Sequence, residues 1–228
     1  MEIIPDKKYA VITGDIIGST KLEPESRRKL FDVMQECSET LRLNYSEVLP
    51  YEIDIFSGDS WQMLIIDPAL SLRIALFYRA SLRSMMESHD FDTRMFIGIG
   101  PIQFIPENRI SSGDGEAFQL SGRNLEGMKK NRLGIACPDH PYEHELKIVV
   151  ELIDAIATHW TDRQARAITG ALLNLKQSEI SKLWDPEITQ QSTSEFLDLA
   201  SWHAVEKGLY YCEHKLKQVN IPVIDKNR

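Results

Sequence analysis

Two aspartates in this sequence, Asp15 and Asp59, each follow a glycine directly. Asp15 comes at the end of a short apolar, β-branched run, and Asp59 lies between two further runs of that kind. Carboxylates next to glycine can converge without a bulky neighbour, and such a pair suits Mg²⁺ or Mn²⁺ that bridges phosphates. A single Gly-Asp dipeptide is also a common turn former, so a purely structural role is the alternative.

The residues around Asp15 favour the metal interpretation. The stretch 14–20 combines backbone N–H groups, hydroxyl groups and the start of a helix in one turn, which is how a triphosphate is held beside its metal. The predicted nucleotide-binding residues are Ile16, Ile17, Gly18, Ser19 and Thr20 from this turn and Gly58 from the second site.

These stretches resemble the class III nucleotidyl cyclases. In that family the first strand ends in an Asp-Ile-Val-Gly-Phe-Thr-like sequence, here residues 15–20, and a hairpin carries a Gly-Asp, here residues 58–59. The resemblance implies that Asp15 and Asp59 bind the catalytic metals. It also implies that the helix after residue 115 presents Arg123 to the transition state, with Gln119 where asparagine is usual. The active site of the family is shared across a homodimer.

The sequence departs from the cyclases at two places. Ile55 stands where the family has a lysine that reads a purine, which leaves the choice of base open. A second phosphate-binding lysine has no clear counterpart; Lys129, Lys130 and Arg132 lie near the third element, but a solvated helix end is the alternative for them.

The chain also resembles the bacterial SatD-like family, in which a cyclase-like domain precedes a helix-turn-helix. The matching stretches are residues 11–19, 56–62 and the block that begins at residue 160. This resemblance covers nearly the whole chain and implies an architecture more than a reaction.

The elements that must position these residues follow from apolar periodicity. Alternating and continuous apolar runs predict strands, whereas three- and four-residue steps predict helices. The predicted order is a strand at 8–17, a helix at 24–48, a hairpin at 51–66 with Asp59 at its tip, a helix at 68–88, a strand at 93–105 and a helix at 116–130. Gly98 and Gly100 indicate close backbone approach or a bulge in the later strand. This order predicts an α+β domain, and the cyclase resemblance implies a ferredoxin-like sandwich.

The remainder is helical in pattern. A proline-containing stretch at 131–145 predicts a seam between a domain at 1–138 and a helical domain at 146–228. Helices are predicted at 147–160, at 176–184 and at 189–216. A further helix is predicted to begin at a capping box formed by Thr161 and Gln164. A short helix, a break and a long helix outline a helix-turn-helix, whose DNA-contacting residues would be Gln190, Gln191, Ser192 and Thr193. Protein contact or dimerisation is the alternative role.

Composition sets the limits of this interpretation. The 228 residues carry a formal net charge of -8, of which the first 146 residues hold -7, so bulk electrostatic binding to nucleic acid is disfavoured. The three cysteines, Cys37, Cys137 and Cys212, are widely spaced, which argues against a disulfide framework or a thiolate zinc site. With neither a secretory signal nor a long apolar run in this sequence, we expect a cytoplasmic protein and no membrane partner.

The sequence therefore leads to the hypothesis of a regulatory protein. A front domain would bind a nucleoside triphosphate with Mg²⁺ or Mn²⁺, and the helix-turn-helix would bind DNA or a partner. Two alternatives stay open: an active nucleotidyl cyclase, and a DNA-binding transcription regulator with a catalytically inactive front domain.

Overall fold

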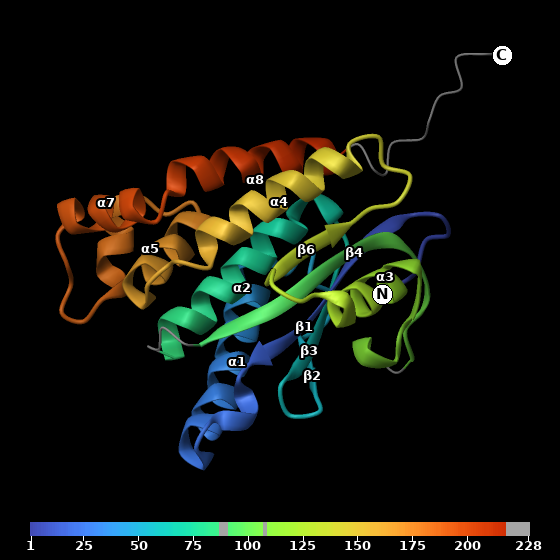
Figure 1. Ribbon diagram of the computed structural model, residues 1–228, viewed down its shortest axis with the longest axis horizontal. Helices are drawn as coiled ribbons and strands as arrows, with labels where there is room; N and C mark the ends of the chain where they lie inside the picture. The colour runs from blue at the N-terminus through green and yellow to red at the C-terminus, as the bar shows by residue number, and fades with distance from the viewer. Residues whose placement is uncertain (87–90, 107–108, 218–228) are drawn as a thin grey trace.

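A computed structural model describes residues 1–86, 91–106 and 109–217 of the chain (Figure 1). Its centre is a mostly antiparallel sheet, and β1, the first strand, lies in the middle of that sheet. The strand order is β2 (Asp54–Phe56), β3 (Ser60–Ile65), β1 (Lys8–Ile17), β4 (Asp92–Phe104) and β5 (Asp114–Gly115), and β6 (Leu133–Ala136) pairs with β4 in parallel. The α+β class predicted from the sequence is confirmed at this level.

Eight α-helices accompany the sheet in the described part of the chain. They are α1 (Pro24–Tyr45), α2 (Ser71–Met86), α3 (Glu116–Gly127), α4 (Glu143–Ala157), α5 (Asp162–Leu172), α6 (Gln177–Ile180), α7 (Gln190–Leu199) and α8 (Trp202–Leu216). Short 3-10 turns lie at Ser19–Lys21, Pro68–Leu70, Ile110–Ser112 and Ser181–Leu183. None of these described helices combines the length and apolar character that crossing a membrane requires.

The alternation of side chains along β1 divides the core into two layers. Ala10, Ile12 and Ile16 face the larger apolar cluster, which includes buried residues of α1 and α2. Tyr9 and Val11 face a smaller cluster with α3. Residues of β1 with odd numbers therefore lie on the α3 face of the sheet.

Helix α3 approaches β4 closely at Gly98, which is the first of the two alternatives predicted for this glycine pair. A Cβ at Gly98 would overlap the carbonyl oxygen of Ala117 and lie 2.6 Å from the backbone nitrogen of Ser121. The Ser121 hydroxyl hydrogen-bonds the Thr13 hydroxyl of β1 at 2.8 Å, and both side chains are buried. This contact fixes α3 on the sheet next to the end of β1.

The C-terminal helices pack on the sheet part of the chain through α2 and β6. One apolar cluster runs from Ala10 of β1 to Leu216 of α8. Figure 1 shows α4 and α8 side by side, and their contact includes Gly208 against Val149 and Ile153. The division into domains at 1–138 and 146–228 stays a prediction, and its last part, 218–228, lies outside the described residues.

The helical region differs from the prediction in one important respect. Residues 189–216 are not one long helix: α7 ends at Leu199 and α8 begins at Trp202. Ser201 between them has a left-handed backbone, with φ of 56°, and the Ala200 carbonyl accepts a hydrogen bond from the indole of Trp160. The predicted capping box at Thr161 and Gln164 is confirmed at the start of α5.

The other boundaries differ by shorter stretches. The helix predicted at 147–160 begins earlier, at Glu143, and α3 ends at Gly127, so the basic residues at 129–132 lie in a loop. The helix predicted at 68–88 begins as a 3-10 turn, and residues 87 and 88 lie outside the described chain.

Candidate functional site

Asp15 and Asp59 lie next to each other at one end of the sheet. The backbone N–H of Ile16 donates to the carbonyl oxygen of Asp59 at 3.2 Å, and Asp15 is directly opposite Ser60 in the β1–β3 register. The hairpin turn that positions Asp59 contains Ser57 and Gly58, whose φ angles of 53° and 86° are both left-handed. Two aspartates that are 44 residues apart in the sequence thus meet through the backbone.

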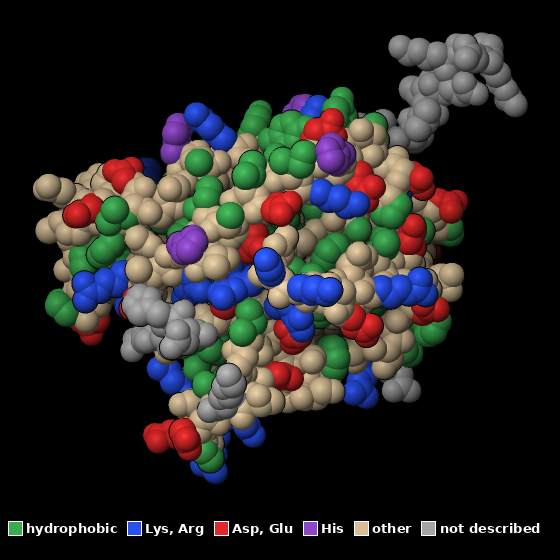
Figure 2. Space-filling view, viewed as in Figure 1, with side chains coloured by type: hydrophobic (Ala, Val, Ile, Leu, Met, Phe, Trp, Pro, Cys, Tyr) green, Lys and Arg blue, Asp and Glu red, His purple; other side chains and the backbone are tan. Residues whose placement is uncertain are grey.

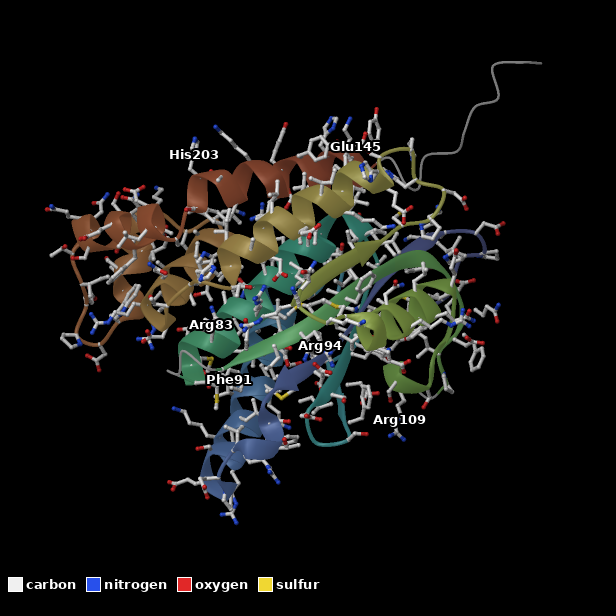
Figure 3. The ribbon with its side chains drawn as sticks, in the orientation of Figure 1. Arg83, Phe91, Arg94, Arg109, Glu145 and His203 are labelled. Atoms are coloured by element: carbon white, nitrogen blue, oxygen red, sulfur yellow. The ribbon has the colours of Figure 1, made fainter. Side chains whose placement is uncertain are left out.

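The side chain of Asp15 is paired with an arginine that the sequence did not point to. Arg94 lies opposite Asp15 on β4, and its guanidinium contacts both carboxylate oxygens, Nε at 3.1 Å from Oδ1 and Nη2 close to Oδ2. Its Nη1 donates to the carbonyl oxygen of Met128 at 3.1 Å, after the end of α3. Hydrogen bonding to Asp15 raises the pKa of Arg94 above its ordinary value. In Figure 3, Arg94 lies near one end of α3.

Asp59 has a different partner. The hydroxyl of Ser19 donates a hydrogen bond to Oδ2 of Asp59. Gly18, with φ of 76°, turns the chain after β1 so that Ser19 can reach the hairpin. A small cavity of about 160 Å³ is lined by Asp59, Ser19, Thr20 and Arg27, among other residues.

The backbones of Asp15 and Asp59 therefore meet, but their carboxylates do not share a partner in this structure. Asp15 shares the α3 face with Thr13 because both have odd numbers on β1, whereas Asp59 is directed to the turn before α1. No group of three or more His, Cys, Asp or Glu side chains with metal-binding geometry occurs among the residues that the structure describes.

The predicted phosphate-binding residues have mixed surroundings. Gly18, Thr20 and Gly58 are exposed, and Ser19 is buried with its hydroxyl on Asp59. Ile16 is 3% exposed, and its N–H group is already bonded to Asp59. Ile17 is half-buried and pairs with Asp92 at the end of β1. Asp15 itself is not the last residue of β1, because the strand continues for two residues after it.

The predicted catalytic residues lie on α3. Gln119 and Arg123 are both exposed, and the Gln119 amide donates to Asp114 at 3.4 Å. Among the described residues of this chain, neither side chain is hydrogen-bonded to Asp15 or Asp59, whose partners are Arg94 and Ser19. Arg94 and Arg27 are the cations that the structure adds to the site. Arg94 lies beside Asp15 because the two residues are opposite each other in the β1–β4 register. The sequence alone does not give this register, so it could not identify Arg94 as a site residue.

The predicted DNA-contacting residues lie at the start of α7. Gln190 and Gln191 are exposed, whereas Ser192 is half-buried and bonds Thr189, which caps the helix. Thr193 is fully buried, and its hydroxyl donates to the carbonyl oxygen of Thr189 at 3.2 Å. Thr193 therefore has no surface with which to contact a base, since its place in α7 is internal.

A buried ion network adjoins the candidate site. Asp92, two residues before Arg94, accepts from Arg79 and Arg83 of α2 and from Arg132, and Arg79 also donates to Asp154 of α4 at 2.7 Å. Burial raises the pKa of the Asp92 carboxyl, but the surrounding guanidinium groups outweigh burial and lower that pKa overall. Figure 3 places Arg83 toward the end of α2.

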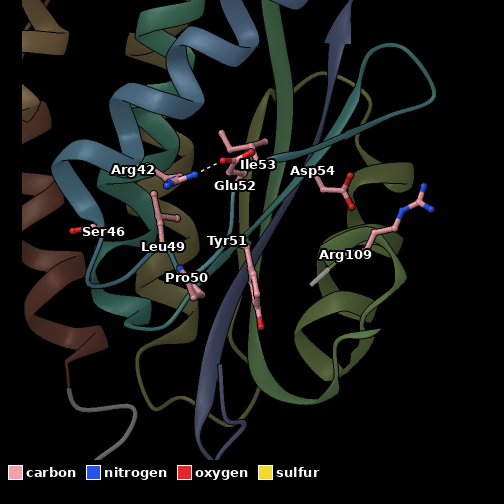
Figure 4. A pocket seen from close by; sticks show the side chains of 9 residues that line it. All are labelled: Arg42, Ser46, Leu49, Pro50, Tyr51, Glu52, Ile53, Asp54 and Arg109. Carbon is pink, nitrogen blue, oxygen red and sulfur yellow. Dashed lines mark hydrogen bonds and ion pairs between the residues drawn. The ribbon is translucent and has the colours of Figure 1, made fainter. Parts of the chain in front are cut away.

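A second, larger cavity lies away from these aspartates. It has a volume of about 760 Å³ and is lined by residues from the end of α1 to β2 together with Arg109 (Figure 4). The ion pair of Arg42 with Glu52 closes one side of it, and both side chains are largely exposed. This cavity contains neither Asp15 nor Asp59.

Comparisons with known proteins found no matching family model, no matching curated protein and no matching solved structure.

Proposed function

We propose that this protein binds a nucleoside triphosphate together with Mg²⁺ or Mn²⁺ at the end of the sheet where Asp15 and Asp59 meet. The observation that carries the proposal is the 3.2 Å hydrogen bond from Ile16 to the Asp59 carbonyl, because it brings the two aspartates to one place. The neighbouring Gly18 turn and the exposed Thr20 leave room for phosphate groups beside them.

The fold supports this proposal. The four central strands, in the order β2-β3-β1-β4, are all antiparallel to their neighbours. Chain order is strand, helix, two strands, helix, strand, and both helices contribute to the core on one face of the sheet. We propose that this arrangement is a ferredoxin-like sandwich and that the front part is a cyclase-like version of it.

The donor set fits a hard divalent cation. Asp15 and Asp59 would hold the metal with carboxylate oxygens, and phosphate oxygens and water would complete its coordination. Such a cation neutralises phosphate charge and polarises the phosphorus centre. Asp15 would have to leave Arg94, and the released guanidinium would then be within reach of the phosphates. Ser19 would continue to orient Asp59 through its hydroxyl.

The position of α3 bears on whether the site is catalytic. Arg123 and Gln119 are exposed, and Gln119 bonds Asp114 instead of either metal-site aspartate. The resemblance to the cyclases implies a homodimer in which Arg123 of a second chain faces the aspartates. We propose this homodimer as the form in which a cyclic nucleotide could be made; without catalysis, the same site acts as a nucleotide sensor.

A continuous set of contacts supports a regulatory role. Arg94 binds Asp15, whereas Asp92, two residues earlier on β4, is held by arginines that also reach Asp154 of α4. Release of Arg94 from Asp15 would therefore act on the strand end that anchors α4. Binding of DNA or a protein partner by the C-terminal helices would be the process that nucleotide binding regulates.

The test combines binding with product detection. The purified protein is mixed with each of ATP, GTP, CTP and UTP in millimolar Mn²⁺, and melting temperature and new nucleotide products are measured. We expect one nucleotide to raise the melting temperature only when the metal is present. Asp59→Asn should abolish that rise, whereas Asp198→Asn on the exposed surface of α7 should retain it.

A new nucleotide product that is absent in the Asp59 variant would establish a cyclase. The lack of any metal-dependent shift in melting temperature would refute the proposal.

A further inference from the structure

The segment from Arg123 to Arg132 is basic although the protein is acidic. It contains four Lys or Arg residues and one Glu, whereas the whole chain has a formal net charge of -8. Arg123, Lys129 and Lys130 are exposed, and Arg132 has 31% of its side chain exposed. We refer to Arg123, Lys129, Lys130 and Arg132 as the basic strip.

The loop that carries the two lysines is fixed at both ends. Before them, the Met128 carbonyl accepts a hydrogen bond from Arg94 at 3.1 Å. After them, the Arg132 N–H donates to Asp154 at 2.8 Å, and its carbonyl accepts from Met95 at 2.8 Å. Lys129 and Lys130 are thus presented to solvent from a short, anchored connection, which lowers the entropy lost when they bind a ligand.

Three of the four charges of the strip have no ion pair in the described part of the chain. In the part of the chain that the structure describes, the ion pairs do not include Arg123, Lys129 or Lys130. Arg132 contacts Asp92, but that carboxylate is shared with Arg79 and Arg83. Figure 2 shows Lys and Arg side chains gathered in a band across this face of the molecule.

We infer that the basic strip binds the phosphate backbone of duplex nucleic acid. Three exposed cations without an ion pair in the described part of the chain, together with a fourth that shares Asp92, suit a regularly charged polyanion. The segment 123–132 contains no aromatic residue on which bases could stack, so contact with phosphates is favoured over recognition of a single strand. This surface is separate from the start of α7. It shares Arg123 with the proposed homodimer site, so binding is measured without nucleotide or metal at Asp15 and Asp59.

Salt dependence gives the sharpest test. Binding of the full chain to a fluorescent 20-base-pair DNA duplex is followed by anisotropy in EDTA, at about 50 to 200 mM salt. If four cations contact phosphates, the slope of log affinity against log salt is about -3.6. Lys129→Gln with Lys130→Gln should reduce the slope by about 2 and weaken binding at least about tenfold. Absence of binding at the lowest salt would overturn the inference.

Matched variants distinguish the strip from net charge and from α7 as the source of binding. Lys207→Gln on α8 with Lys217→Gln directly after α8 removes the same charge from exposed positions and should leave the affinity within about twofold. If both double variants weaken DNA binding equally, the effect arises from net charge alone and the inference is wrong. Loss of binding in Gln190→Ala with Gln191→Ala, with the lysine variant unaffected, would assign binding to α7 instead.

Two further measurements keep the test independent. Asp15→Asn with Asp59→Asn should bind the duplex as the unmodified protein does, so failure of the nucleotide proposal would leave this result intact. Circular dichroism of the Lys129 and Lys130 variant should show an unchanged fold. If that variant only melts earlier, with unchanged DNA binding, the lysines merely stabilise the end of α3 and the inference is wrong.

Discussion

Arg94 lies directly opposite Asp15 on the neighbouring strand, and its guanidinium binds both oxygens of the Asp15 carboxylate. The pair is about one-third exposed, with 32% of the Arg94 side chain and 27% of the Asp15 side chain accessible. An internal cation thus takes the place at which the proposed metal would bind. Any metal must compete with this guanidinium for the carboxylate.

Removing that competitor should increase metal binding. In Arg94→Gln the carboxylate of Asp15 is free, and we expect the affinity for Mn²⁺ alone to rise by about three- to tenfold, since a partly exposed ion pair contributes roughly 1 kcal/mol. Isothermal calorimetry without nucleotide measures this change. Arg27→Gln, which removes a cation beside Asp59 instead, is the control for loss of positive charge alone. A lower Mn²⁺ affinity in Arg94→Gln would show that Arg94 helps to hold the metal site together.

The buried network around Asp92 should make stability depend on pH. The lowered pKa of Asp92 means that the charged form stabilises the folded state at pH values above its ordinary pKa of 3.8. That contribution is lost as the pH falls through the lower pKa of the folded protein. Asp92→Asn leaves three buried or half-buried arginines without this partner, and we expect it to lower the free energy of unfolding by about 3 to 5 kcal/mol. Urea titrations from pH 7 to pH 3 measure both effects.

The pH series also contains the control for this prediction. The difference between the unmodified protein and Asp92→Asn should begin to shrink below pH 3.8, because the carboxylate of the unfolded state takes up a proton there and the contribution of the charged form declines. Glu52→Gln, which breaks the exposed pair with Arg42, should change stability by less than about 1 kcal/mol at every pH. A constant difference for Asp92→Asn across the series would show that the effect does not arise from the charge of Asp92.

Much of the sheet could be predicted from local sequence. Strand β1, the hairpin around Gly58 and the helical steps of α1 and α2 follow from apolar periodicity, which depends on residues near one another in the chain. The predicted bounds of β1 agree with the structure to the residue. The break at Ser201 escaped prediction because apolar residues continue at helical steps across it. What ends α7 is a tertiary contact, the hydrogen bond from Trp160 to the Ala200 carbonyl.

The candidate site was predictable only in part. Asp15 and Asp59 were found because glycine and carboxylate occur together in the sequence. Their partners Arg94 and Ser19 depend on strand register and on the turn at Gly18, neither of which can be read from residue types. The same limit applies to Thr193, whose hydroxyl suggested a surface role but which is buried in the packing of α7.

Two glycines near α3 should respond in opposite ways to alanine. Gly98→Ala would place a methyl group against the Ala117 carbonyl and Ser121 nitrogen, and overpacking of this kind costs about 1 to 3 kcal/mol. Gly122, inside α3, has open space around its Cβ position, so Gly122→Ala should stabilise the protein by about 0.5 to 1 kcal/mol. Chemical denaturation measures both. Equal effects of the two substitutions would contradict the close approach of α3 to β4.

The three thiols should be unreactive until the protein unfolds. Cys37, Cys137 and Cys212 are all buried, and burial is the main cause that raises their pKa values, to about 11 for Cys137 and about 12 for Cys212. The thiolate is the reactive form, so at pH 8 only roughly one thiol in a thousand or fewer is in that form. We expect reaction with Ellman's reagent to be at least about 100-fold slower in the native protein than in guanidinium chloride, because burial restricts access as well. The unfolded protein should release three equivalents and so provides the internal control. One equivalent released within seconds from the native protein would mean that a cysteine is accessible, and Cys137→Ser, Cys37→Ser and Cys212→Ser would identify which one.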